Sequence, residues 1–140
     1  MTEENFNIEA LRNALAILKV CWQTYQEKQN DASIADIVAD SCVKRFEYTM
    51  ETSLKLMRKY LKLFYAKEDK ELTVNNIFRL MAGMDMLTNW ENWRRYYAKR
   101  NDTSHEYNIE KARELLDIIP SFIADTEFLI AAFDKALAGA

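Results

Sequence analysis

The scarcity of residues that turn or break a helix constrains this chain more than any other feature of its sequence. Only two glycines and one proline occur among 140 residues, so the chain has little with which to build hairpin turns or flexible linkers. Apolar residues recur at spacings of three and four, which is the period of an amphipathic helix and differs from the alternation of a strand. The sequence therefore predicts an all-α protein.

Four long amphipathic segments are expected, at about residues 8–29, 34–65, 73–86 and 108–137. Thr73 is expected to cap the third, Asn89 to cap a shorter additional helix that holds Trp90 and Trp93, and Pro120 to bend the last helix. A chain of this length fits one domain with a sizeable core. We therefore expect residues 1–140 to form a single domain, an antiparallel four-helix up-and-down bundle with a short additional helix.

Charge, cysteine content and hydropathy narrow the possible function classes. A formal net charge of −3 argues against overall attraction to nucleic acid, so any such site has to be local. Cys21 and Cys42 are too few and too far apart for a disulfide framework, and we expect both to be reduced thiols in the core. No apolar run reaches the roughly 18 residues of a membrane span, and the first residues lack a signal-peptide pattern. A cytoplasmic protein with no membrane segment is expected.

His105 is the only histidine, and this limits the chemistry that a helical bundle can perform. A di-iron site of the ferritin type needs two Glu-x-x-His pairs, which one histidine cannot supply. The sequence also lacks a glycine-rich phosphate loop, a GxSxG elbow and a cysteine beside a second histidine. We therefore expect neither a metal nor a cofactor.

The stretch "RNDTSHEYN", residues 100–108, contains this histidine together with an arginine. Thr103 and Glu106 match a capping box, which would place His105 in the first turn of the last helix, and Asn108 is a competing cap. Under either choice the positive end of a helix dipole would keep the imidazole neutral and available as a base. Arg100 supplies a permanent cation for a phosphate.

An arginine and a neutral histidine form a minimal metal-free phosphodiester site. In RNA the 2′-hydroxyl is a built-in nucleophile, so a base that deprotonates it and a cation that holds the phosphate can suffice for cleavage. The spacing alone is a weak motif, because a polar loop that only caps a helix would show the same residues.

Two stretches of the chain resemble one known family. "RNDTSHEY" resembles the Arg-x4-His-x-Tyr signature of the HEPN superfamily, and more closely the "RN-x-TSH-x-Y" form of nucleotidyltransferase substrate-binding proteins. "VKRFEYTMETSLKLMRKYL", residues 43–61, is similar to the "QRFEFTYELSWKLLKRYL" type of segment in the same proteins. The resemblance covers roughly residues 34–137. Ser53 matches the family serine, whereas Leu54 and Met50 stand where the family often has Trp and Tyr, which affects local packing.

The resemblance implies a function, partners and site residues. HEPN proteins of this kind are encoded beside a minimal nucleotidyltransferase and form a complex with it, and many such pairs behave as toxin and antitoxin. The toxin is a metal-free endoribonuclease acting on single-stranded RNA as a homodimer, with arginine and histidine contributed by both protomers. Carried over by position, Arg100 and His105 are the catalytic pair, Asn101 is a supporting neighbour, and Tyr107 is the tyrosine that the partner adenylylates. Glu47 is expected either to orient the site as an acceptor or to be a solvated helix carboxylate.

Two further functions stay open at this point. The chain could be a non-catalytic subunit that presents a substrate to the nucleotidyltransferase, which the acidic neighbours Asp102 and Glu106 favour because they repel RNA phosphates. A basic cluster favours the ribonuclease: Arg94, Arg95, Lys99 and Arg100. A helical scaffold without a site is the third alternative.

Overall fold

The computed structural model describes residues 6–105 and 109–139, without the side chains of residues 102–105 and 109. In this part of the chain every regular element is helical, which confirms the all-α prediction. The elements are α1 (Glu9–Lys28), α2 (Ala35–Tyr65), the short 3-10 helix η2 (Asp69–Glu71), α3 (Val74–Gly83), α4 (Trp90–His105) and α5 (Ile109–Ala138).

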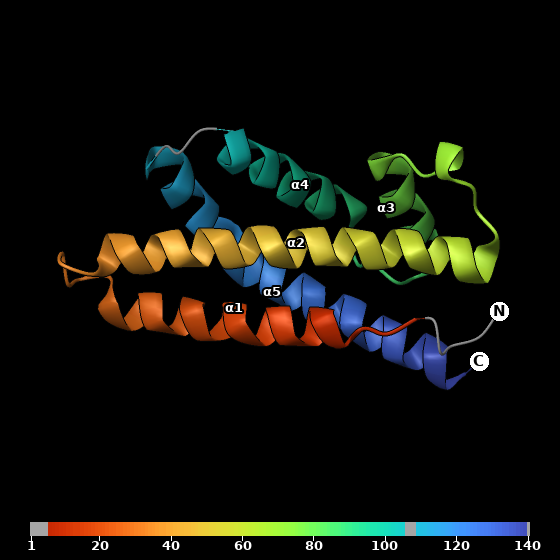
Figure 1. Cartoon of the computed structure of the whole chain (residues 1–140), viewed down its shortest axis with the longest axis horizontal. Coiled ribbons are helices and arrows are strands. Elements are labelled where there is room, and N and C mark those ends of the chain that lie inside the picture. Colours follow the sequence, from red (N-terminus) through yellow and green to blue (C-terminus); the bar gives the residue numbers. More distant parts are fainter. Residues whose placement is uncertain (1–5, 106–108, 140) are drawn as a thin grey trace.

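Four of these helices form the predicted up-and-down bundle (Figure 1). α1 and α2 run side by side in opposite directions, α4 runs back along the other side of α2, and α5 crosses behind them. α2 packs against each of the other α-helices, so it is the central element of the bundle. α3 is the short additional helix, and it lies next to α4 on the same side of α2.

The prediction of which helix is the short one is wrong. The segment capped by Asn89 is 16 residues long and belongs to the bundle, whereas the segment capped by Thr73 has only 10 residues. α3 stops early because Gly83 ends it and Asp85 takes a left-handed backbone conformation with φ 59°. No glycine or proline interrupts the sequence of α4 from Trp90 to His105, so that helix continues.

The other helix boundaries agree closely with the sequence pattern. α1, α2 and α5 begin and end within one residue of the predicted limits. Thr73 Oγ1 accepts the backbone N–H of Asn76 at 3.3 Å, and Asn89 Oδ1 accepts that of Glu91 at 3.0 Å, which confirms both caps. α5 continues through Pro120, and the bend expected there stays a prediction.

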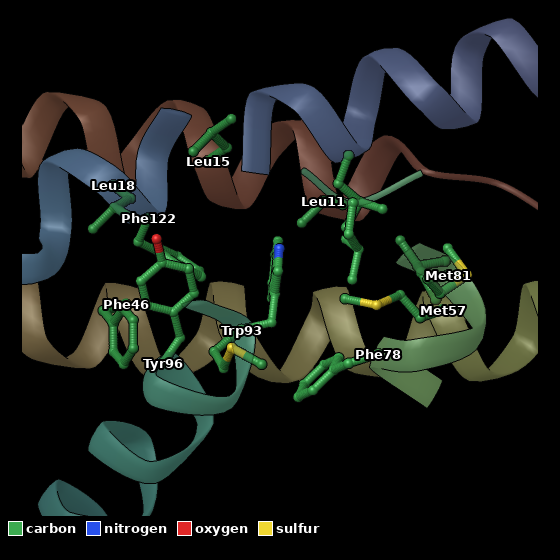
Figure 2. Close-up of a cluster of buried hydrophobic side chains, with 14 of the residues drawn as sticks. Leu11, Leu15, Leu18, Phe46, Met57, Phe78, Met81, Trp93, Tyr96 and Phe122 are labelled. Atoms are coloured by element: carbon green, nitrogen blue, oxygen red, sulfur yellow. The ribbon is translucent and has the colours of Figure 1, made fainter. Parts of the chain in front are cut away.

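The apolar faces of all five α-helices meet in one core (Figure 2). Leucines of α1, Phe46 and Met57 of α2, Trp93 of α4 and Phe122 of α5 point toward one another there. Cys42 is buried, Cys21 is half-buried, and both are free, as predicted. Burial raises the pKa of the Cys42 thiol to about 12, so this cysteine stays protonated and unreactive near neutral pH.

Candidate functional site

Arg100 is half-buried between α4 and α2, with 28% of its side chain exposed. Its Nη2 donates a hydrogen bond to Oε1 of Glu51 on α2, and the two groups form an ion pair. Its Nη1 donates to Oδ1 of Asn101 at 3.1 Å. Because these bonds hold the guanidinium from two sides, Arg100 occupies a defined position at the α2–α4 contact.

A groove opens beside Arg100 with a volume of about 360 Å³. Two helices supply its walls, α2 with Met50, Glu51, Leu54, Lys55 and Arg58, and α4 with Tyr97 and Arg100. Three of these side chains are cations and one is a carboxylate, so the groove is locally basic although the chain is acidic overall. The groove therefore offers a local site for an anion. The sequence interpretation did not name Lys55 or Arg58.

The basic cluster that the sequence predicted along α4 does not form a single patch. Lys99 Nζ pairs with Glu114 Oε2 of α5 at 3.3 Å, and the guanidinium carbon of Arg94 lies 5.3 Å from the centre of the Trp90 ring. Only Arg100 of this cluster lines the groove. Neighbouring positions of a helix differ by about 100° in direction, so consecutive basic residues diverge.

Glu51 is a residue that the sequence interpretation missed. Glu47, the predicted acceptor, lies one turn before Glu51 on α2 and is half-buried. Residues four apart share a face of a helix, so the pair of acids in "FEYTMET" could have pointed to Glu51 as well. Whether Glu47 helps to orient the site stays a prediction.

His105 is the last residue of α4, and its side chain lies outside the described residues. The prediction that Thr103 begins the last helix is wrong, because Thr103 lies within α4 and α5 begins at Ile109. The form of the dipole argument that rests on Thr103 falls with it, whereas the form that rests on Asn108 stays a prediction. An N-cap also needs a non-helical backbone, which a residue inside α4 does not have.

The backbone positions of Arg100 and His105 do not share a face of α4. Five residues along an α-helix correspond to a rotation of about 140°. Within one protomer, the two predicted catalytic residues therefore lie on different sides of the α4 axis. Tyr107, the predicted modified residue, and the competing cap Asn108 lie outside the described residues.

The first half of α4 is fixed to α5 by a polar cluster around Asp125. Its Oδ2 accepts hydrogen bonds from the Tyr96 hydroxyl and from Asn92 Nδ2, the latter at 3.3 Å. Its Oδ1 accepts from Thr88 Oγ1 at 3.2 Å. Burial and the Asp125 hydrogen bond raise the pKa of the Tyr96 phenol well above its usual value. These contacts set the position of the helix that carries Arg100.

Within residues 6–105 and 109–139, no three histidine, cysteine, aspartate or glutamate side chains gather where they could hold a metal ion. No helix in the described part of the chain is long and apolar enough to cross a membrane.

Comparison with known proteins gives one family and one relative. The family model described as nucleotidyltransferase substrate binding protein like matches residues 6–135. A protein of Haemophilus influenzae named probable ribonuclease HepT is 27% identical over 99 residues, which cover 69% of this chain and 68% of that protein.

Two solved structures share the fold. A Haemophilus influenzae structure, described as the substrate binding domain of a nucleotidyltransferase, superposes with a TM-score of 0.79 at 24% identity and covers 89% of this chain and 97% of that one. A crystal structure of a Thermus thermophilus protein has a TM-score of 0.62 at 22% identity and covers 81% of this chain and 96% of that one.

Proposed function

The chain belongs to the nucleotidyltransferase substrate binding protein like family, and we propose that it is a metal-free endoribonuclease that cleaves single-stranded RNA. In this proposal a minimal nucleotidyltransferase is its partner and neutralises it. One observation carries the proposal: Arg100 is held beside a basic groove, on the helix that ends at His105. The similarity to a probable ribonuclease supports it.

The proposed reaction needs one base, one acid and one cation. His105 takes the proton of a ribose 2′-hydroxyl, and that oxygen attacks the adjacent phosphorus. The bond from phosphorus to the 5′-oxygen breaks, the leaving oxygen takes a proton from an acid, and a 2′,3′-cyclic phosphate and a 5′-hydroxyl result. Arg100 stabilises the charge that develops on the phosphoryl oxygens.

We propose a homodimer as the active form because one protomer supplies only one histidine. A second His105 would provide the acid, and Arg100 of one protomer could serve the histidine of the other. The rotation of about 140° between positions 100 and 105 of α4 supports a site shared between protomers. Asn101 supports Arg100 through its hydrogen bond.

The test is cleavage of single-stranded RNA by the purified protein in the presence of a chelator. His105→Ala and Arg100→Ala should each lower the rate by roughly 10²- to 10⁴-fold, the usual cost of losing a general acid or base or a charge-stabilising group. Arg94→Ala is the matched control, since Arg94 stacks on Trp90 away from the groove. Cleavage that stops with the chelator, or that persists in both site variants, would refute the proposal.

Control by the partner is proposed to act through Tyr107. Adenylylation of its phenolic oxygen would add bulk and negative charge close to a site that has to admit an RNA phosphate. Intact-mass measurement after co-expression with the partner nucleotidyltransferase should show one added adenylyl group, which Tyr107→Phe abolishes. An unshifted mass, or a shift that survives in Tyr107→Phe, would rule this tyrosine out.

The second candidate function is a non-catalytic subunit that presents a substrate to the nucleotidyltransferase. The ion pair of Arg100 with Glu51 favours it, because a phosphate has to compete with a carboxylate that already holds the guanidinium. This function predicts a complex with the nucleotidyltransferase and no RNA cleavage by the protein alone. Assaying the purified protein before and after the partner is added distinguishes the two candidates.

A further inference from the structure

The groove beside Arg100 has cations that the proposed cleavage chemistry does not use. Lys55 is exposed, and the described part of the chain gives it no ion pair. Arg58 donates from Nη1 to the backbone carbonyl of Leu72 at 2.8 Å, a bond that fixes its guanidinium at the groove wall. Two cations therefore stand on α2 within one helical turn of each other, beside a third on α4.

The same groove also has an apolar and aromatic wall. Met50 is buried, whereas Leu54 and the Tyr97 ring are half-buried and line the groove. Unstacked bases of single-stranded RNA bind to such aromatic and apolar surfaces, while cations bind the phosphates that connect them. The groove combines both kinds of surface in one space.

The size of the groove limits what can occupy it. A volume of about 360 Å³ is at the small end of the roughly 300–1,000 Å³ that ligand pockets enclose, which suits one nucleotide better than a folded RNA. Arg100 lines the groove, so a nucleotide bound there would be next to the phosphate that Arg100 holds.

We infer that this groove is a nucleotide subsite of the RNA strand, adjacent to the cleaved phosphodiester. Lys55 and Arg58 bind the neighbouring phosphate, and the Tyr97 ring with Leu54 receives the base. The inference rests on the proposed function for the identity of the ligand. It adds the path of the RNA over the protein surface, which leads from Arg100 along α2 toward Arg58.

RNA binding can be measured apart from cleavage in the His105→Ala background. The probe is a fluorescein-labelled single-stranded RNA of about ten nucleotides, and its anisotropy gives Kd at several salt concentrations. Lys55→Ala should raise Kd several-fold at low salt and reduce the slope of log Kd against log salt by about 0.7, the value for one phosphate contact on a single strand. Tyr97→Leu should raise Kd by about 5- to 50-fold with the slope unchanged.

Lys19→Ala is the matched control. Lys19 is also an exposed lysine, but it pairs with Glu127 at 3.0 Å in a different groove between α1 and α5. Its removal should leave both Kd and the salt slope unchanged. Circular dichroism of each variant checks that the helices are intact.

Cleavage by the same variants with His105 intact tests the nucleotide subsite separately from the ribonuclease activity. Lys55→Ala should raise KM with little change in kcat, because the contact is equal in the ground and transition states. Normal binding and cleavage by both Lys55→Ala and Tyr97→Leu would overturn the subsite and leave the ribonuclease standing. RNA binding that depends on Lys55 and Tyr97 without any cleavage would support the subsite and refute the ribonuclease. Absence of RNA binding in the parent protein would overturn both.

Discussion

The two halves of α4 have opposite characters although they belong to one continuous helix. The first half carries Trp93 and Tyr96, which are buried among aromatic rings. The centre of the Phe122 ring lies 5.8 Å from that of Trp93 and 5.0 Å from that of Tyr96. In the second half, the described side chains from Tyr97 to Asn101 are half-buried or exposed, and Arg100 contacts Glu51 through an ion pair and Asn101 through a hydrogen bond. The first half contributes packing, and the second contributes charge at a groove.

This difference separates stability from the proposed chemistry. The rings and the Asp125 cluster hold the start of α4 against α5, so the second half of α4 can place Arg100 at the groove without being needed for the core. Changes in the first half should therefore affect folding, and changes in the second half should affect binding and catalysis. Four predictions test this separation.

The largest stability effect is expected for Trp93→Ala. Removing a fully buried indole leaves a cavity and should lower the free energy of unfolding by about 3–5 kcal/mol. Arg100→Ala in the second half should change it by only about 1 kcal/mol, because partly exposed ion pairs contribute little. Urea denaturation followed by circular dichroism measures both. Equal losses in the two variants would contradict the separation.

Asp125→Ala should have the next largest effect. The change leaves the buried Tyr96 hydroxyl without its carboxylate acceptor, at a cost of about 1–3 kcal/mol in unfolding free energy. Tyr96→Phe removes the other partner, and the double variant should cost less than the sum of the two single changes. Strict additivity in this double-mutant cycle would show that the hydrogen bond contributes nothing.

Alkaline pH should lower the free energy of unfolding through Tyr96, in the first half of α4. Its folded pKa is raised above the usual value of about 10, so the stabilisation is complete below about pH 10 and is lost as the pH rises toward the folded pKa. Stability should fall by about 1.4 kcal/mol per pH unit for this one group in that range. Tyr96→Phe should remove the contribution of Tyr96 to the slope of unfolding free energy against pH. Tyr60, whose pKa is raised to about 12, should contribute to the slope that remains. An identical slope in Tyr96→Phe would exclude Tyr96 as a source.

The smallest effect is expected for Glu51→Gln in the second half. The ion pair with Arg100 is partly exposed, with 43% of the Glu51 side chain accessible, so its loss should cost less than about 1 kcal/mol. If a phosphate competes with Glu51 for Arg100, the same change should lower the Kd for single-stranded RNA by a few-fold. Weaker RNA binding in Glu51→Gln, measured by anisotropy, would instead mean that Glu51 positions Arg100 for the ligand.

Local interactions made most of the fold predictable. The caps Thr73 and Asn89, the limits of α1, α2 and α5, and the buried stripes depend on residues within a few positions of one another. The capping-box prediction failed because Thr103 lies within α4. No glycine or proline stands between Trp90 and Thr103 to end the helix before that residue.

The sequence by itself determined that the chain is helical, where most of its helices begin and end, and which family its motifs resemble. Tertiary structure decided that α4 is a bundle helix, that Glu51 accepts the bond of Arg100, and that Lys55 and Arg58 join it at one groove. The physical reason is the rotation of each helix about its axis. Hydrogen bonds and caps act over about four residues, whereas the rotation that brings α2 and α4 face to face is set by the packing of the whole core.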